Sequence, residues 1–152
     1  MLVVETPKDL VKHVGETLGP SSWITVDQAT IDKFAEATGD HQWIHVDVER
    51  AKREMSGGKT IAHGYLTLSL LPRMMPELLK VTKRSRGVNY GSNKIRFITP
   101  VAAGSRVRLR STLKNVEEVE GNGYRITFES TIEIEGQPRP AMVAETLGIQ
   151  YA

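Results

Sequence analysis

The sequence predicts an α+β fold in which an antiparallel sheet wraps around a long central apolar helix. The first observation is the segment AHGYLTLSLLPRMMPELLK, residues 62–80, which is apolar at nearly every position from Tyr65 to Leu71. A helix that is apolar on all sides is normally buried. The second observation is that apolar and polar residues alternate after residue 85, which is typical of antiparallel strands with one buried face. Helices followed by a run of strands indicate the α+β class.

The chain has the length and composition of one ordinary globular domain. Its 152 residues, 39% hydrophobic and 25% charged, favour a single domain over residues 1–152 rather than a disordered or fibrous protein. A net charge of +2 without a dense Lys/Arg block does not favour nucleic acid as a partner. The absence of cysteine excludes disulfides and Cys-based zinc sites and favours a cytoplasmic protein. No apolar run has the length of a signal-peptide core or membrane span, so we expect neither export nor membrane insertion.

The N-terminal segment predicts a short helix and a short strand. TPKDLVKHVGETLG, residues 6–19, has the apolar spacing of an amphipathic helix, with Thr6 as the N-cap and Pro7 at the first helical position. SSWITV, residues 21–26, is a short run with strand character.

Two further helices are expected before the central one. Asp27 is placed to cap a helix over residues 28–38, which Gly39 ends. VERAKREM, residues 48–55, predicts a second helix, and the glycine-rich SGGKT, residues 56–60, predicts a loop.

The second half of the chain predicts at least four antiparallel strands. RVRLRSTL, residues 106–113, places apolar side chains and Ser111 on one face and arginines on the other. YRITFESTIEIE, residues 124–135, repeats this alternation, and the glycines and asparagine between the two segments suit a hairpin turn. NKIRFITP, residues 93–100, and AMVAETLGIQYA, residues 141–152, complete the sheet.

The segment ATGDHQWIHVD, residues 37–47, gathers titratable side chains between predicted helices. On one continuous helix Asp40 and His45 would lie about 140° apart, so they converge only if a turn follows Gly39. A carboxylate and an imidazole that share a water molecule can perform general acid–base catalysis. The alternative is structural, because an Asp after Gly39 is often a turn residue and a His near Trp43 is often only packed and hydrogen-bonded.

A second polar signal lies at the start of the predicted central helix. The free N–H groups and positive dipole of that helix end would favour negative charge developing on an oxygen atom. Gly64 would leave room there for a substrate carbonyl. Alternatively, Gly64 only permits close packing, and His63 only caps or packs.

Three segments resemble the MaoC-like, (R)-specific enoyl-CoA hydratases of the hot-dog fold. FAEATGDHQWIHVD, residues 34–47, is similar to the family's motif of an aromatic residue followed by T-G-D-x-N-P-x-H-x-D. IAHGYLTLSLL, residues 61–71, and IRFITPVAAGSRVRL, residues 95–109, resemble its central helix and following strand. The resemblance covers residues 22–150, and the motif matches at Phe34, Thr38, Gly39, Asp40, His45 and Asp47.

One departure from the motif changes the expected turn. The family's Asn-Pro is Gln42-Trp43 here, as in a subgroup called nodulation protein N-like dehydratases. Trp43 brings bulk and an indole N–H to the turn and could equally belong to the core. Asp47 is expected to cap the next helix rather than to react.

The resemblance implies a hot-dog homodimer that acts in fatty acid metabolism. It would interconvert trans-2-enoyl-CoA and (R)-3-hydroxyacyl-CoA without a metal or other cofactor. Asp40 and His45 would be the catalytic acid and base, with their individual roles left open. The expected oxyanion or substrate-binding positions are Gln42, Trp43, His63, Gly64 and Tyr65. Because phosphates favour basic groups, the candidates for the CoA phosphates are Lys83, Arg84, Arg86, Lys94 and Arg96.

Two other functions are compatible with much of the pattern. A hot-dog acyl-CoA thioesterase would commonly use a carboxylate on or near the central helix, but the first acid of that segment, Glu77, lies at the far end from His63. A non-catalytic acyl-CoA-binding module would keep the apolar helix and strands, yet it would have no use for Asp40 and His45 together.

Overall fold

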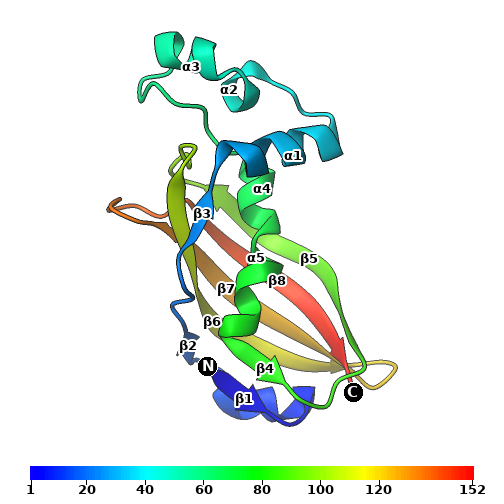
Figure 1. Ribbon diagram of the computed structural model, residues 1–152. Helices are drawn as coiled ribbons and strands as arrows, with labels where there is room; N and C mark the ends of the chain where they lie inside the picture. Colours follow the sequence, from blue (N-terminus) through cyan, green and yellow to red (C-terminus); the bar gives the residue numbers. More distant parts are fainter.

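A six-stranded antiparallel sheet forms the frame of the protein. The computed structural model describes residues 1–152, and its long strands curve behind a run of short helices (Figure 1). The strand order is β2-β6-β7-β8-β5, and β3 also pairs with β6. The bounds are β2 Thr17–Leu18, β3 Ile24–Val26, β5 Arg86–Phe97, β6 Ser105–Val119, β7 Gly123–Ile134 and β8 Met142–Tyr151.

The central apolar segment lies across the inner face of this sheet, which confirms the predicted α+β arrangement. The sequence predicted one long helix here, but the structure has three consecutive pieces. They are α4 Gly64–Ser69, α5 Leu71–Met74 and the 3-10 turn η2 Met75–Glu77. Proline has no N–H to donate to the preceding turn, so Pro72 and Pro76 interrupt the helical hydrogen bonds. The apolar side chains of the run still fill the main core cluster, namely Leu66, Leu70, Leu71, Met74 and Leu78.

The predicted alternation of β6 and β7 is confirmed. Val107 and Leu109 point into the core, while the arginines that alternate with them, Arg106, Arg108 and Arg110, lie on the outer face. On the inner face the buried hydroxyls of Ser111 and Ser130 lie 2.6 Å apart and bond to each other. On the outer face Arg108 and Arg110 both donate to Glu133, at 2.7 Å and 2.6 Å. Partial burial raises the pKa of Glu133, but the hydrogen bonds and positive charges of the two arginines together outweigh it and leave that pKa below its usual value.

Strand β5 begins at Arg86, seven residues earlier than the sequence indicated. It pairs with β8 on one side only, so it forms an edge of the sheet. Val88, Tyr90 and Phe97 are exposed along it. The segment RGVNYGS was missed because it is rich in glycine and lacks clear alternation.

The N-terminal segment covers the end of the sheet away from α1 (Figure 1). Strand β1 Leu2–Val4 pairs in parallel with β4 Leu79–Val81, and the 3-10 helix η1 Pro7–His13 follows. The expected amphipathic helix up to residue 19 is therefore wrong in type and length. Only Pro7 and Leu10 are buried in η1, so the segment has too narrow an apolar face for a longer helix. Val4 and Leu10 form a second and smaller apolar cluster with residues of β4, β6 and β7.

Three helices project beyond the opposite end of the sheet, above α4 (Figure 1). They are α1 Gln28–Thr38, α2 Trp43–Val46 and α3 Val48–Glu54. The predicted caps are confirmed, since Asp27 accepts a hydrogen bond from the Thr30 N–H at 2.9 Å and Asp47 accepts one from the Arg50 N–H at 3.0 Å. None of the helices combines the length and apolar character that a membrane crossing requires.

Candidate active site

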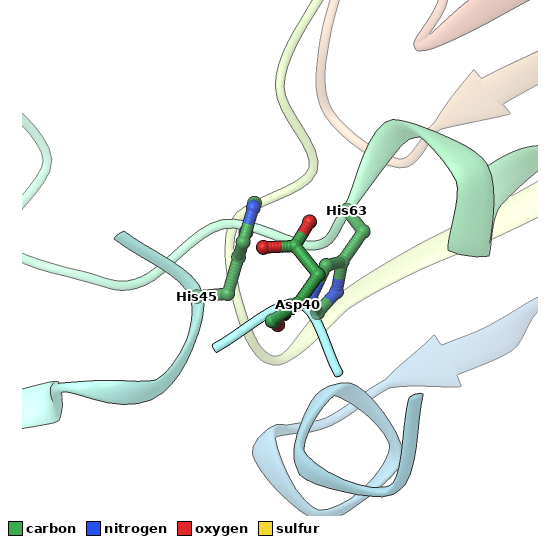
Figure 2. A group of neighbouring side chains, drawn as sticks. All are labelled: Asp40, His45 and His63. Atoms are coloured by element: carbon green, nitrogen blue, oxygen red, sulfur yellow. Dashed lines mark hydrogen bonds between the residues drawn. The ribbon is translucent and has the colours of Figure 1, made fainter. Parts of the chain in front are cut away.

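The turn after α1 brings three titratable side chains together. Gly39 ends α1 in the left-handed conformation, with φ of 78°, and the chain then runs without helix until α2 begins at Trp43. Asp40 and His45 consequently approach each other and meet His63, which comes from the start of α4 (Figure 2). A carboxylate oxygen of Asp40 and one ring nitrogen of each histidine all lie within 4.8 Å of one another.

His45 is held in a defined tautomer. Its side chain is buried, and Nδ1 lies 2.7 Å from the carbonyl oxygen of Ile61. A carbonyl only accepts hydrogen bonds, so Nδ1 carries the proton of the neutral ring. The lone pair of Nε2 is therefore free to accept a proton or a hydrogen bond.

His63 contacts both other members of the cluster. Its Nε2 donates to the backbone carbonyl of Asp40 at 3.0 Å, and its ring stacks on that of His45 with centroids 3.9 Å apart. The same ring packs against Phe34 at 4.9 Å. Its Nδ1 is buried without a hydrogen-bond partner, as suits an unprotonated nitrogen. His63 thus supports the turn that carries Asp40 and one face of the His45 ring.

The Asp40 side chain is exposed at the open side of the cluster. The carboxylate accepts one weak hydrogen bond, from the Gln42 N–H at 3.3 Å. The backbone N–H of Asp40 donates to the Thr38 hydroxyl at 3.3 Å. Most of the accepting capacity of the carboxylate is thus available to a water molecule or substrate.

The three side chains are a poor set for a metal ion. A metal bound by imidazole lies along the nitrogen lone pair, in the plane of the ring. The rings of His45 and His63 are stacked with only 24° between their planes, so one ion cannot lie in both planes at bonding distance. The arrangement suits proton transfer better than metal binding.

A cavity of about 200 Å³ opens beside His45 and Gly64. The Gly64 N–H is the first of α4 and donates no backbone hydrogen bond. A Cβ atom at Gly64 would lie 3.1 Å from the Phe97 ring, so glycine permits this close contact. The remaining lining residues are Ile61, Ala62, Thr67, Ile98, Thr99, Pro100, Val101 and Ala141.

Of the five predicted binding residues only Gly64 lines this cavity, and His63 contacts the dyad instead. Tyr65 is 70% exposed and packs edge-on against Phe97 at 6.1 Å. The Gln42 side chain is exposed, and only the backbone carbonyl of Gln42 accepts a hydrogen bond, from the His45 N–H at 3.0 Å. The interpretation of Trp43 as a core residue is wrong, because the ring is only half-buried and carries the guanidinium of Arg50 at 4.0 Å.

The basic residues expected at the CoA phosphates do not form one cluster within the chain. Lys83 pairs with Glu5. Arg84 precedes β5, and Arg86 stacks on the Tyr151 ring at the start of that strand. At about 3.3 Å per residue, Arg86 lies roughly 36 Å along β5 from Phe97 and the cavity.

Lys94 and Arg96 lie at the cavity end of β5 but on its other face. Ile95 packs against the core and Phe97 lines the cavity. Because neighbouring side chains of a strand alternate, Lys94 and Arg96 point to the outer face of the sheet, away from the cavity.

Two residues at the site were not found from the sequence. Gln28, on α1, donates through its amide to the His45 carbonyl at 2.8 Å and accepts from the Thr60 hydroxyl. Neither residue belongs to a motif, and 32 positions separate them. No local signal in the sequence joins them.

Comparison with known proteins identifies the family. A family model described as "MaoC like domain" matches residues 9–133, which include Asp40, His45, His63 and Gly64. The chain belongs to the MaoC-like dehydratase family. This MaoC-like chain is 46% identical over 147 residues to the 3-hydroxyacyl-thioester dehydratase Z of Mycobacterium tuberculosis, covering 97% of each. It is 48% identical over 142 residues to nodulation protein N of Rhizobium leguminosarum bv. viciae, covering 93% of this chain and 88% of the relative.

The solved structures confirm the fold of this MaoC-like chain. The unliganded R-hydratase PhaJ1 of Pseudomonas aeruginosa superposes with a TM-score of 0.67 at 20% identity, covering 91% of this chain and 81% of the other. The predicted hot-dog fold and the likeness to nodulation protein N are both confirmed.

Proposed function

We propose that the protein interconverts a trans-2-enoyl thioester and an (R)-3-hydroxyacyl thioester by adding or removing water. The observation that carries this proposal is the approach of Asp40 and His45 at an apolar cavity. The relative named a 3-hydroxyacyl-thioester dehydratase, 46% identical over nearly the whole chain, supports the choice of substrate class. CoA thioesters are the carriers that we would test first.

In the hydration direction, the reacting water would lie between the Asp40 carboxylate and Nε2 of His45. His45 suits the role of base, because its Nδ1 proton is held by the Ile61 carbonyl and Nε2 keeps a free lone pair. As Nε2 takes a proton from water, the hydroxyl oxygen bonds to the β-carbon and the π electrons of the double bond move to the α-carbon and thioester. The α-carbon then takes the proton from Nε2, while the Asp40 carboxylate orients the water.

Gly64 would stabilise the charge that develops in this step. The negative charge of the enolate lies mainly on the thioester oxygen. A free N–H at the first turn of α4 can donate to that oxygen, and the absence of a side chain lets the oxygen approach. His63 would act on the dyad by supporting Asp40 and His45 rather than by touching the thioester.

The test follows the loss of enoyl-thioester absorbance with crotonyl-CoA and a longer trans-2-enoyl-CoA, and resolves the configuration of the product. We expect His45→Ala to lower turnover about a hundredfold or more, the usual contribution of general acid–base groups. Asp40→Asn should lower it by a similar factor, because a neutral amide holds the reacting water less firmly than the carboxylate does. His41→Ala is the matched control, because His41 lies next to the site in sequence but is exposed and outside the cluster.

Near-normal turnover in either dyad variant would contradict the assignment. Release of free CoA would instead indicate a thioesterase. Binding without any reaction would indicate a non-catalytic acyl-CoA-binding module.

We also propose that two copies pair through β5. The strand is long, unpaired on one side and bears the exposed side chains of Val88 and Tyr90. Such an edge favours association with another strand. If two β5 strands pair antiparallel, the Arg86 end of one copy lies beside the Phe97 end of the other. Arg84 and Arg86 would then approach the other copy's cavity, where they could bind CoA phosphates.

Sedimentation at micromolar concentration is expected to give a dimer, and a monomer would contradict this pairing. In the dimer, Arg84→Ala and Arg86→Ala should raise KM for a CoA thioester more than for the pantetheine thioester, which lacks the nucleotide phosphates. Equal effects on both substrates would remove these arginines from the phosphate site.

A further inference from the structure

The strongest unassigned feature is a half-buried amide beside the dyad. Gln28, the first residue of α1, does not touch the cavity. Its Nε2 donates to the His45 carbonyl at 2.8 Å and to the Asp32 carboxylate at 2.9 Å. Its Oε1 accepts from the hydroxyl of Thr60, a residue that is almost completely buried. The two hydrogens of the amide and its oxygen are therefore all engaged.

These contacts close a ring of hydrogen bonds around His45. On one side, Gln28 joins the His45 carbonyl to Thr60. On the other, the His45 side chain donates through Nδ1 to the carbonyl of Ile61, the residue after Thr60. Between them, the Ile61 N–H donates to the Ile44 carbonyl at 3.0 Å. The backbone and the imidazole of His45 are thereby held against the same short segment, residues 60–61.

The helix that carries His45 needs such external support. Helix α2 has only four residues, and no side chain caps its first turn. A single helical turn has little stability of its own. Without the Gln28 bonds, α2 would stay joined to this segment mainly through the N–H and the carbonyl of Ile61, and it could pivot about these two bonds.

We propose that Gln28 is a positioning residue that fixes the orientation and tautomer of His45. By holding the His45 carbonyl and Thr60 at a set separation, Gln28 keeps the Ile61 carbonyl in line with Nδ1. This contact leaves the lone pair on Nε2, the atom that faces the reaction. The catalytic part of this inference rests on the proposed hydration, whereas the effect on the imidazole does not.

A neutral amide is the chemical group that these contacts require. Glutamate has the same shape, but its carboxylate cannot donate to the His45 carbonyl and would repel it. Gln28→Glu therefore removes both donated bonds without opening a cavity. Thr60→Val removes the hydroxyl that orients the amide, and Thr60→Ser restores it.

The test combines kinetics with nitrogen NMR of the imidazole. We expect Gln28→Glu and Thr60→Val to lower kcat about tenfold, within the range usual for groups that orient a reacting side chain, with KM changed less than about twofold. The ¹⁵N shifts of His45 should move from those of a pure Nδ1–H tautomer toward an average of the two tautomers. Thr60→Ser should restore both readouts, and Gln137→Glu, the same change in an exposed loop, should alter neither.

Unchanged His45 shifts in Gln28→Glu would overturn the proposal, whatever the rate. A raised KM with normal kcat would also overturn it, because it would indicate a role in substrate binding. If the wild-type protein hydrates no enoyl thioester, the proposed function fails, and the nitrogen shifts alone still decide whether Gln28 orients His45.

Discussion

Replacing Gly64 by alanine separates the chemistry of the carbonyl site from its packing. An ideal Cβ at Gly64 would lie 3.1 Å from Cγ and Cδ2 of Phe97 and 3.2 Å from Cδ1. Carbon atoms in good contact are about 3.5–4.0 Å apart, so the ring must retreat by a few tenths of an ångström. The Phe97 side chain is 49% exposed, which lets the ring tilt toward solvent.

The expected effect of Gly64→Ala on stability is small. Overpacking costs about 1–3 kcal/mol in a closed core, and this half-open position should lie near the lower limit. Alanine recovers roughly 0.5–1 kcal/mol relative to glycine in a helix. The free energy of unfolding in urea should therefore change by less than about 1 kcal/mol.

The expected effect on catalysis is larger. A methyl group beside the Gly64 N–H would keep a thioester oxygen out of hydrogen-bond range. Loss of one such donor costs about 2.7–4 kcal/mol of transition-state stabilisation, so kcat should fall about a hundredfold. Gly57→Ala is the matched control, because no atom lies within 4 Å of a Cβ there.

A double variant identifies the cause of the loss. In a Phe97→Ala background the alanine at position 64 no longer meets the ring. If the methyl group itself blocks the carbonyl, Gly64→Ala should still lower kcat in that background. A loss that disappears with the ring, or a kinetically silent Gly64→Ala, would refute the assignment of the Gly64 N–H to the oxyanion.

Two further predictions concern stability. Ser130→Ala should destabilise the fold by about 1–3 kcal/mol in urea unfolding, because it leaves the buried Ser111 hydroxyl without its partner. The double variant with alanine at both Ser111 and Ser130 should be more stable than Ser130→Ala alone, because no hydroxyl is left unpaired. A double variant that is no more stable than the single one would contradict this reasoning. Hydrogen bonds from the backbone N–H and then the hydroxyl of Ser22 lower the pKa of Glu77 below its usual 4.5. A carboxyl group whose pKa is lower in the folded state than in the unfolded state stabilises the fold at pH values above the unfolded-state pKa. This stabilisation is lost as the pH falls through the folded-state pKa. Glu77→Gln should thus lower Tm at pH 7 and differ less from wild type near pH 4, and an equal difference at both pH values would refute the linkage.

The parts of the fold that sequence predicted well depend on local patterns. The caps Asp27 and Asp47 and the left-handed Gly39 act within a few residues, so their neighbours identify them. The alternation in β6 and β7 has the same local character. The division of the central segment at Pro72 and Pro76 was also readable in principle, but the continuous apolar pattern dominated the interpretation.

The candidate site was only partly predictable, because much of it depends on contacts distant in sequence. Asp40 and His45 are close in the chain, and their convergence follows from the turn after Gly39. The contact between His63 and Asp40 spans 23 positions, and no spacing rule indicates that the imidazole would stack on His45. The hydrogen bond from Gln28 to the His45 carbonyl spans 17 positions and depends on tertiary structure, so the sequence did not indicate it.

The basic residues expected at the CoA phosphates do not gather at one place on a single chain, for a geometric reason. The sequence predicted a strand over residues 93–100 that contains Arg96 but not Arg86, and it did not indicate which face each side chain takes. Once β5 is known to start at Arg86, its length places the two arginines at opposite ends. Face and distance are properties of register, which the pattern RGVNYGS does not encode.

The two apolar clusters of the core divide the molecule into regions with different tolerance to change. The larger cluster lies under α4 and includes Leu66 and Val101 near the cavity. The smaller one joins residues of η1, β1 and β4, among them Leu10, to Leu113, Ile126 and Phe128 of β6 and β7. Substitutions around Leu10 would mainly affect packing at the end of the sheet away from α1. Substitutions around Leu66 would shift α4 and the cavity beside His45 and Gly64. Selection for turnover should therefore act more strictly on the first region than on the second.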